Sequence, residues 1–262
     1  MQFADEFKGK KVVVTGACGV IGSWIVDGFR EAGAILCLTD RDQAQLDALP
    51  AMRAGEGHVA IAADLRDAQS MKDFASKLGA EWGAPDILVN NAGIYPSGFL
   101  LDIDVDDWDA IFDVNLRAPF VLSTLFARQM IDAGKGGSII NVSSGASRKM
   151  RTTVVPYCTS KTALDRLTKG LALELAEYGI RVNALEPGFM AGSQSSPLSD
   201  EHVNAAISGI PLGRPSSAKD VVSALFYLCS EGGAYVTGGT LTVDGGNSIG
   251  TKAVFQAKKT AL

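Results

Sequence analysis

Seven short apolar runs, separated by longer amphipathic segments, most constrain how this 262-residue chain can fold. The runs are rich in β-branched residues without strict polar alternation, which is typical of strands buried on both faces of a parallel sheet. They lie at residues 11–15, 34–39, 59–63, 87–90, 138–142, 181–185 and 240–243. The segments between them are long enough for helical crossovers. The pattern therefore predicts an α/β fold, with a doubly wound, seven-stranded parallel sheet and helices on both faces.

We expect one domain over residues 1–262, because no Pro-, Gly- or Ser-rich linker divides the chain. Two stretches break the regular rhythm. The connection at about 189–215 contains Ser, Gly and Pro and one short helical piece near 202–207. Long connections of this kind often form substrate loops. The tail at 249–262 follows the last expected strand, and we expect it either to be disordered or to dock on another subunit.

Charge and residue counts exclude several classes of function. The chain carries 24 basic and 29 acidic residues, a net charge of −5, and no basic run, which is untypical of nucleic-acid-binding proteins. Its two histidines, His58 and His202, lie far apart in sequence, so we expect neither a metal site nor a Ser-His-Asp triad. Four cysteines without CxxC spacing, no apolar signal region and no apolar run of membrane-spanning length indicate a cytoplasmic protein.

The first expected strand ends in a glycine-rich turn, Thr15 to Gly22, and a helical pattern begins at once. Glycine lets the backbone approach a pyrophosphate, and a helix N-terminus offers amide donors to it. Asp40 ends the second expected strand, 18 residues past Gly22, where a carboxylate can bind the ribose of NAD and repel the extra phosphate of NADP. The spacing predicts a Rossmann-type domain that prefers NAD, a preference that Arg41 weakens without removing.

A tyrosine and a lysine four residues apart, Tyr157 and Lys161, open a helical pattern that runs to Tyr178. Residues at i and i+4 lie on one helix face, so the phenol and the ammonium point the same way. A free tyrosine has a pKa of about 10, and a nearby cation lowers that pKa by favouring the phenolate. The pair is suited to proton transfer near neutral pH, although the motif alone is common by chance.

Several motifs follow in a fixed order along nearly the whole chain, from Lys10 to about Gly246. They are the glycine turn at 15–22, Asp64, the Asn-Asn-Ala-Gly run at 90–93, Asn115, Ser144, Tyr157 with Lys161, and Pro187-Gly188. Ser144 precedes Tyr157 by 13 residues, as it does in relatives. In this order the motifs are highly specific. The sequence resembles the short-chain dehydrogenase/reductase family, in its compact branch of about 250 residues.

The resemblance implies a role for each matching position. Ser144 would hydrogen-bond and polarise the substrate oxygen, and Tyr157 would donate or accept the proton. Lys161 would hold the nicotinamide ribose and depress the pKa of Tyr157. Asn115 would kink its helix and hold a water in a proton relay. The resemblance also implies a homotetramer built through the helices expected at 116–133 and 157–178.

The same resemblance implies the cofactor contacts. Asp64 and Leu65 would flank the adenine, and Asn91, Ala92 and Gly93 would pack beside the cofactor and the central sheet. The full set of expected cofactor residues is Gly16, Gly19, Val20, Ile21, Gly22, Asp40, Arg41, Asp64, Leu65, Asn91, Ala92, Gly93, Tyr157, Lys161, Pro187, Gly188 and Met190.

The sequence departs from the compact-branch pattern at two positions. Relatives carry glycine at the position of Val20, whereas the glycines here fall at 16, 19 and 22, as in the longer branch of the family. This puts the detailed loop geometry in doubt. Relatives also carry threonine at the position of Gly192, so Ser193 either replaces its contact with the nicotinamide or the contact is lost.

The substrate is the least determined feature. Three cations in four positions, Arg148, Lys149 and Arg151, follow Ser144, which is unusual in an acidic chain. Either Arg148 or Arg151 pairs with an anionic substrate group, or the loop is solvated or forms an ion pair between subunits. The hydroxyl-rich stretch at 192–196, which includes Gln194, suits a sugar or polyol. Tyr95, Phe189 and Met190 supply one apolar wall.

Three functions remain open. The first is an NAD-dependent enzyme that interconverts a secondary alcohol and a carbonyl on a polar, sugar-like and possibly carboxylated or sulfonated substrate. The second is a 3-oxoacyl-carrier-protein reductase, against which Asp40 argues because that biosynthetic reduction usually uses NADPH. The third is an NAD-binding sensor without turnover, against which the presence of Ser144, Tyr157 and Lys161 together argues.

Overall fold

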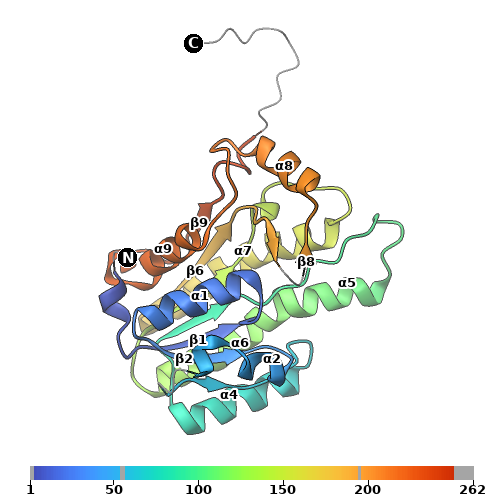
Figure 1. The fold of residues 1–262 in the computed structure, drawn as a ribbon. Helices are drawn as coiled ribbons and strands as arrows, with labels where there is room; N and C mark the ends of the chain where they lie inside the picture. Colours follow the sequence, from blue (N-terminus) through green and yellow to red (C-terminus); the bar gives the residue numbers. More distant parts are fainter. Residues whose placement is uncertain (1–2, 54–56, 194–195, 251–262) are drawn as a thin grey trace.

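The computed structural model describes residues 3–53, 57–193 and 196–250, and it confirms the predicted seven-stranded parallel sheet (Figure 1). The strands lie in the order β3-β2-β1-β4-β5-β6-β9. They are β1 Lys11–Thr15, β2 Ile35–Thr39, β3 Val59–Ala60, β4 Ile87–Asn90, β5 Gly137–Val142, β6 Ile180–Pro187 and β9 Thr240–Val243. Because strand order reverses between β1 and β4, the carboxyl ends of the central strands open at a switch point, where ligands bind in such sheets.

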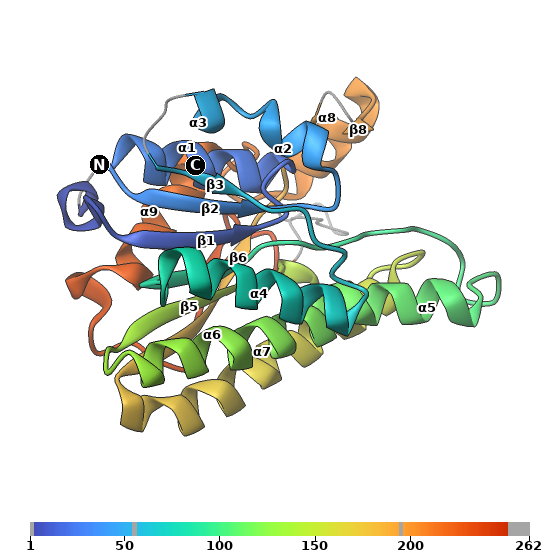
Figure 2. The same cartoon turned by 90° about the horizontal axis from the view of Figure 1, so that it is seen from below.

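Helices cover both faces of the sheet (Figure 2). One face packs against α1 and α9, and the other packs against α4, α6 and α7. The helices are η1 Ala4–Phe7, α1 Val20–Glu31, α2 Gln43–Asp47, α3 Pro50–Arg53, α4 Ala68–Trp82, α5 Val105–Phe112, η2 Asp113–Arg117, α6 Ala118–Asp132, η3 Gly145–Ser147, α7 Val155–Leu175, η4 Ala176–Tyr178, α8 Asp200–Gly209, α9 Ala218–Cys229 and η5 Glu231–Gly233. The η2 segment is a π-helical turn, and the other η segments are 3₁₀ turns.

Two apolar cores fix these helices to the sheet. Phe7, Phe29 and Phe226 form an aromatic cluster on the α1/α9 face, with ring centroids 4.5–5.2 Å apart. Phe74 and Phe126 pack edge to face on the other side at 5.7 Å. All five rings are buried. Burying both faces explains why the strands read as continuous apolar runs.

Side-chain caps begin several of the helices. Asp67 caps α4, Asp104 caps α5, and Ser217 forms a capping box with Asp220 at the start of α9. The helices α1, α6 and α7 begin without a side-chain cap, and α1 begins after Gly19. The first-turn amides of α1 therefore stay available at the carboxyl edge of the sheet.

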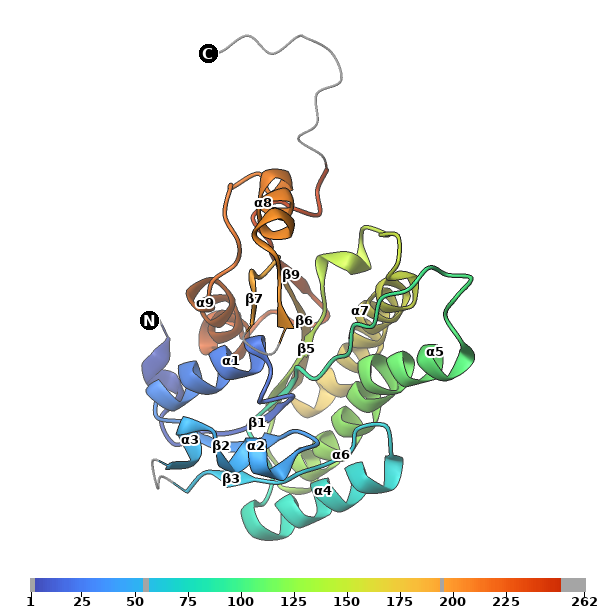
Figure 3. The same cartoon turned by 45° about the vertical axis from the view of Figure 1, so that its right-hand side comes forward.

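The structure differs from the expected elements in three places. The third strand is shorter than the expected 59–63, because its regular pairing with β2 covers only Val59–Ala60. The Ile61 and Ala63 amides still donate to the Leu38 and Asp40 carbonyl oxygens. The connection at 189–215 contains a short antiparallel pair, β7 Gly192–Ser193 and β8 Ser196–Pro197, before α8 (Figure 3). Of the tail, only residues 249–250 belong to the described residues.

One continuous helical stretch, Val105–Asp132, has the length and the mean hydropathy, 1.3, of a membrane span. Half of its apolar window is buried inside the fold. Its α6 part packs against α4 and the sheet. Its apolar character is therefore that of a core helix.

Two helical glycines make a matched test of this packing. A Cβ at Gly170 in α7 would meet nothing within 4 Å, whereas a Cβ at Gly28 in α1 would lie 2.5 Å from Val222 Cγ1. We expect Gly170→Ala to raise the free energy of unfolding by about 0.5–1 kcal/mol, since alanine costs less backbone entropy in a helix. We expect Gly28→Ala to lower it, since α1 and α9 must separate. Urea unfolding measures both, and equal effects of the two substitutions would contradict the packing described.

Candidate active site

The glycine-rich turn is built by close contacts that no larger residue allows. Gly16 has a φ of +64°, and a Cβ on it would lie 2.7 Å from Ala92 Cα. A Cβ on Gly22 would lie 2.0 Å from the Gly16 carbonyl oxygen. Gly19 is the N-cap of α1, and Val20 is the first residue of that helix. The two close contacts of this turn lie at Gly16 and Gly22, and both positions are glycine in this chain. Val20 therefore does not have to fit into either contact. The turn and the open α1 amides fit the pyrophosphate of a dinucleotide.

Asp40 lies directly beside this turn, at the carboxyl end of β2. Its carboxylate accepts from the Cys18 amide at 3.1 Å and from the Arg41 amide at 2.8 Å. Burial, followed by the Asp40 charge, raises the pKa of the Cys18 thiol to about 11. The thiol therefore stays protonated, and the carboxylate is fixed by two backbone donors at the position expected for a ribose contact.

The Asn-Asn-Ala-Gly run fastens the end of β4 to the same turn. Asn91 Nδ2 donates to the Thr15 and Gly16 carbonyl oxygens at 2.9 and 3.0 Å. The Thr15 hydroxyl in turn accepts from the Asn91 and Ala92 amides at 3.0 Å. Gly93 follows, and a Cβ there would lie 3.5 Å from Lys161 Nζ. These residues therefore connect the glycine-rich turn with the Lys161 region.

Asp64 and Leu65 follow β3 at this edge. Asp64 forms an ion pair with Arg66 at 2.9 Å, and hydrogen bonds from Arg66 lower the pKa of the carboxyl. Leu65 is buried in the core. The Asp64 side chain is half exposed, and the expected adenine contacts stay a prediction.

Ser144 and Tyr157 meet in a cavity of about 520 Å³ at the carboxyl edge of the sheet. Ser144 follows β5 and caps the η3 turn by accepting from the Ala146 amide at 3.1 Å. Tyr157 lies in the first turn of α7, and the Tyr95 ring packs edge to face on it at 4.8 Å. Burial raises the pKa of Tyr157, while the hydrogen bond with Ser144 and the Arg151 charge oppose that rise.

Lys161 lies one helical turn after Tyr157 and is 4% exposed. Its Nζ donates to the Val142 carbonyl oxygen at 2.8 Å and lies 5.8 Å from the Tyr157 ring centroid. Burial lowers the pKa of the ammonium to about 8, and the Asp165 charge opposes this. The structure thus places a buried cation beside the tyrosine, and its expected effect on the Tyr157 pKa stays a prediction.

Asn115 occupies the π-helical turn between α5 and α6 and is fully buried. Its Oδ1 accepts from the Ile94 amide at 2.9 Å, and its Nδ2 donates to the Ile94 carbonyl oxygen at 3.0 Å and to Ser160 Oγ at 3.1 Å. Ser160 Oγ donates to the Tyr157 carbonyl oxygen at 2.8 Å. Asn115 therefore connects the β4 loop, the π turn and the first turn of α7.

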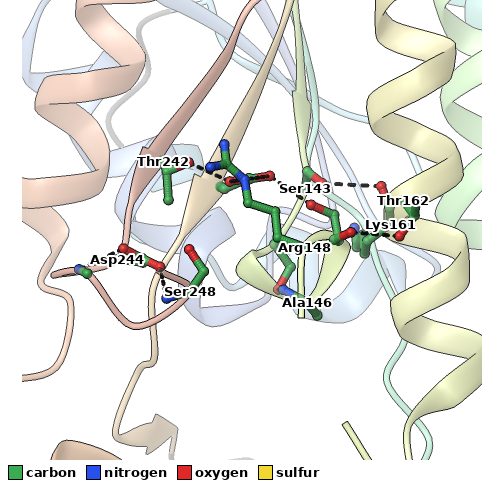
Figure 4. Close-up of polar contacts among 12 residues, drawn as sticks. Ser143, Ala146, Arg148, Lys161, Thr162, Thr242, Asp244 and Ser248 are labelled. Atoms are coloured by element: carbon green, nitrogen blue, oxygen red, sulfur yellow. Dashed lines mark hydrogen bonds and ion pairs between the residues drawn. The ribbon is translucent and has the colours of Figure 1, made fainter. Parts of the chain in front are cut away.

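The substrate candidates separate into two groups. Tyr95, Arg151, Phe189 and Met190 line the cavity, together with the cofactor candidates Val20, Pro187 and Gly188. Arg148 lies outside that lining and forms an ion pair with Glu186 at 3.0 Å (Figure 4). Of the two arginine candidates for pairing with an anionic substrate group, only Arg151 lines the cavity, and that role stays a prediction. Gln194 lies outside the described residues.

Sequence reasoning missed several residues of the cavity wall. The sequence pattern assigns no role to Lys149 within the basic loop, and it does not place His202 near the other site residues. The wall also includes Leu198, Ala206, Asp244, Asn247 and Ser248. The signal for His202 was its place in the short helical piece of a substrate-type loop. Within the described ranges, no cluster of three or more His, Cys, Asp or Glu side chains could hold a metal ion.

Comparisons with known proteins point the same way. The family model described as enoyl-(acyl carrier protein) reductase matches residues 16–248. The L-xylulose reductase of Homo sapiens is 37% identical over 240 residues, covering 91% of this chain and 96% of the relative. The 3-oxoacyl-acyl-carrier-protein reductase of Thermotoga maritima is 34% identical over 243 residues, covering 92% and 98%.

Solved structures add two similar proteins with bound cofactor. A short-chain dehydrogenase of Leptospira borgpetersenii with bound NAD+ is 31% identical with a TM-score of 0.85, covering 95% of this chain and 96% of that one. A gluconate 5-dehydrogenase of Burkholderia cenocepacia in complex with NADP and tartrate is 33% identical with a TM-score of 0.85, covering 95% and 99%. Enzymes that act on alcohol or carbonyl groups are thus common among the relatives. The chain belongs to the short-chain dehydrogenase/reductase family.

Proposed function

We propose that this protein is an NAD-dependent oxidoreductase that interconverts a secondary alcohol and a carbonyl on a sugar-acid-like substrate. One observation carries the proposal. The cavity that holds Ser144 and Tyr157 is also lined by Lys149 and Arg151, and neither cation forms an ion pair within the described part of the chain. Positive groups without partners suit a carboxylate or sulfonate. The similarity to gluconate 5-dehydrogenases supports the same substrate class.

The proposed mechanism divides the work among four side chains. The bound nicotinamide supplies or takes up the hydride. The Ser144 hydroxyl donates a hydrogen bond to the substrate oxygen, where negative charge develops during reduction. Tyr157 gives that oxygen a proton in reduction and removes one in oxidation. Lys161 and Asn115 keep Tyr157 in place and in the required charge state, through the contacts with Val142 and Ser160.

The proposed cofactor preference depends on Asp40. Its carboxylate suits the ribose hydroxyls of NAD, and it would repel the additional phosphate of NADP. Arg41 lies beside it and is the residue through which NADP could still be accepted. A 3-oxoacyl-carrier-protein reductase is the second candidate, and the similarity to the Thermotoga maritima enzyme favours it. It ranks second because that reduction uses NADPH, whose extra phosphate Asp40 would repel.

We also propose a cytoplasmic homotetramer. The four cysteines are free in the structure, which suits a reducing compartment. The helices expected to join subunits, α6 and α7, each expose a large apolar side chain: Phe120 is 48% and Leu173 is 83% exposed. Exposed apolar groups of this kind are used in subunit contacts.

Replacing Asp40 tests the cofactor preference. We expect Asp40→Ser to weaken NAD and to strengthen NADP, so that the ratio of kcat/KM for NADP to that for NAD rises about tenfold or more. Initial rates of reduced-nicotinamide absorbance with each cofactor measure it. Asp73→Ser, an exposed aspartate on α4 that is not among the expected cofactor contacts, is the control and should leave the ratio unchanged. An unchanged ratio in Asp40→Ser would contradict the assignment.

Replacing the two cavity cations separates substrate binding from proton chemistry. We expect Arg151→Met and Lys149→Met each to raise KM for a carboxylated substrate about five- to tenfold, and neither to change KM for its neutral analogue. Arg151→Met should also raise the pKa of Tyr157, because it removes a charge that opposes the effect of burial. Oxidation requires ionised Tyr157, so the rise of kcat with pH should move to higher pH.

Lys149→Met should leave that pH profile where it is. The pH dependence of kcat in the oxidative direction, for both variants and the wild type, is the measurement. Equal losses on acidic and neutral substrates would show that the cations hold the loop rather than the substrate anion.

A further inference from the structure

A fully buried glutamate lies behind the cavity and is not used by the proposed mechanism. Glu186, next to the end of β6, accepts from Ser147 Oγ at 2.8 Å and from Thr242 Oγ1 at 2.6 Å. Arg148 Nε completes the set at 3.0 Å (Figure 4). Glu186 thereby links β6, β9 and the η3 turn that carries Ser144.

A second carboxyl group touches this glutamate. Asp165 lies on α7, one helical turn after Lys161, is partly buried and interacts electrostatically with the Glu186 carboxylate. The Ser143 and Ser147 hydroxyls beside it donate to the Lys161 carbonyl oxygen at 3.5 Å and to Glu186 at 2.8 Å. Asp165 Oδ1 is sealed from solvent and receives no hydrogen bond among the described residues. Two ionised carboxylates in contact repel strongly, and one of such a pair holds a proton instead.

We propose that Asp165 is protonated and donates a hydrogen bond to Glu186, so that the acid–carboxylate pair positions the Ser144 turn against the Lys161 helix. A proton on Asp165 lets its carboxyl group donate a hydrogen bond to Glu186. This explains why Asp165 Oδ1, which solvent does not reach, receives no hydrogen bond from a donor in the described part of the chain. The pair then carries one negative charge, and Arg148 balances it. Asp165 and Glu186 are positioning residues, and this inference rests on the roles proposed for Ser144 and Lys161.

The surroundings of Asp165 favour the protonated form. Burial is the largest cause that raises the pKa of this carboxyl, and the Glu186 charge adds to it, whereas Ser143 and Ser147 oppose it. The charged groups around it are Lys161 on α7, Glu186 on β6, Arg148 after η3 and, beyond Arg148, Asp244 after β9. Lys161 and Arg148 are the cations near Asp165, but the Lys161 ammonium is bonded to Val142 and Arg148 is paired with Glu186.

The proposal makes the active-site turn sensitive to alkaline pH. A folded-state pKa above the unfolded value stabilises the fold fully at low pH, and this contribution is lost as pH rises through the folded value. Beyond it, two adjacent carboxylates repel, and the contacts that hold η3 to α7 weaken. An ionised Asp165 serving as counter-ion of Lys161 is the competing arrangement, and it predicts the opposite: loss of function when Asp165 is neutralised.

Infrared spectroscopy tests the proton without measuring activity. The wild type at neutral pH should show the C=O stretch of a protonated carboxylic acid, and this band should be absent from Asp165→Asn and retained in Asp132→Asn, an exposed control on α6. Absence of the band from the wild type would overturn the proposal. This result is independent of whether the enzyme's substrate has been found.

Kinetics and stability test the positioning role. Asp165→Asn keeps a donor toward Glu186 but cannot ionise, so kcat/KM should match the wild type near neutral pH and exceed it several-fold at alkaline pH. The melting temperature of Asp165→Asn should fall less than that of the wild type as the pH is raised from neutral to alkaline. Asp165→Leu, which leaves Glu186 without that donor, should lower kcat/KM about tenfold. A loss in Asp165→Asn at every pH would instead identify Asp165 as the counter-ion of Lys161.

Discussion

The burial of the Lys161 ammonium is the constraint on which the rest of the site depends. A charged amine taken out of water is costly unless polar groups replace its hydration. Here one backbone carbonyl, that of Val142, faces it at 2.8 Å, and burial lowers its pKa to about 8. The end of β5 and the start of α7 must therefore hold a fixed distance. That requirement explains the polar contacts around them: Asn115 with Ser160, and Ser143 with the Lys161 carbonyl oxygen.

Positive charge is distributed in two layers around the reacting groups. Arg151 and Lys149 lie on the cavity wall, where a substrate anion can reach them. Arg148 lies behind the wall and balances the Glu186 carboxylate. The same short loop therefore serves both the substrate side and the structural side of the active site. Arg151 also acts on the reacting groups, since its charge opposes the rise that burial causes in the pKa of Tyr157.

Sequence alone was sufficient for the sheet, because parallel strands buried on both faces leave an unmistakable apolar pattern. It could not predict that the regular pairing of the third strand ends at Ala60, while single backbone hydrogen bonds toward the second strand continue to Ala63. It also could not choose between Arg148 and Arg151. Their local sequences are equivalent, and they differ because Glu186, a residue 38 positions away, reaches Arg148 through the tertiary fold. His202 was missed for a similar reason, because only the position of α8 brings it to the cavity.

Turnover by the wild type on matched substrates tests the central claim most directly. Purified protein is mixed with NAD, or with NADP, and with sugar acids paired with their neutral counterparts, and reduced-nicotinamide absorbance is followed, with Tyr157→Phe as the control. The account predicts faster reduction of NAD with the carboxylated member of each pair and loss of turnover in Tyr157→Phe. Equal or faster turnover of the neutral members, or undiminished activity of Tyr157→Phe, would contradict it.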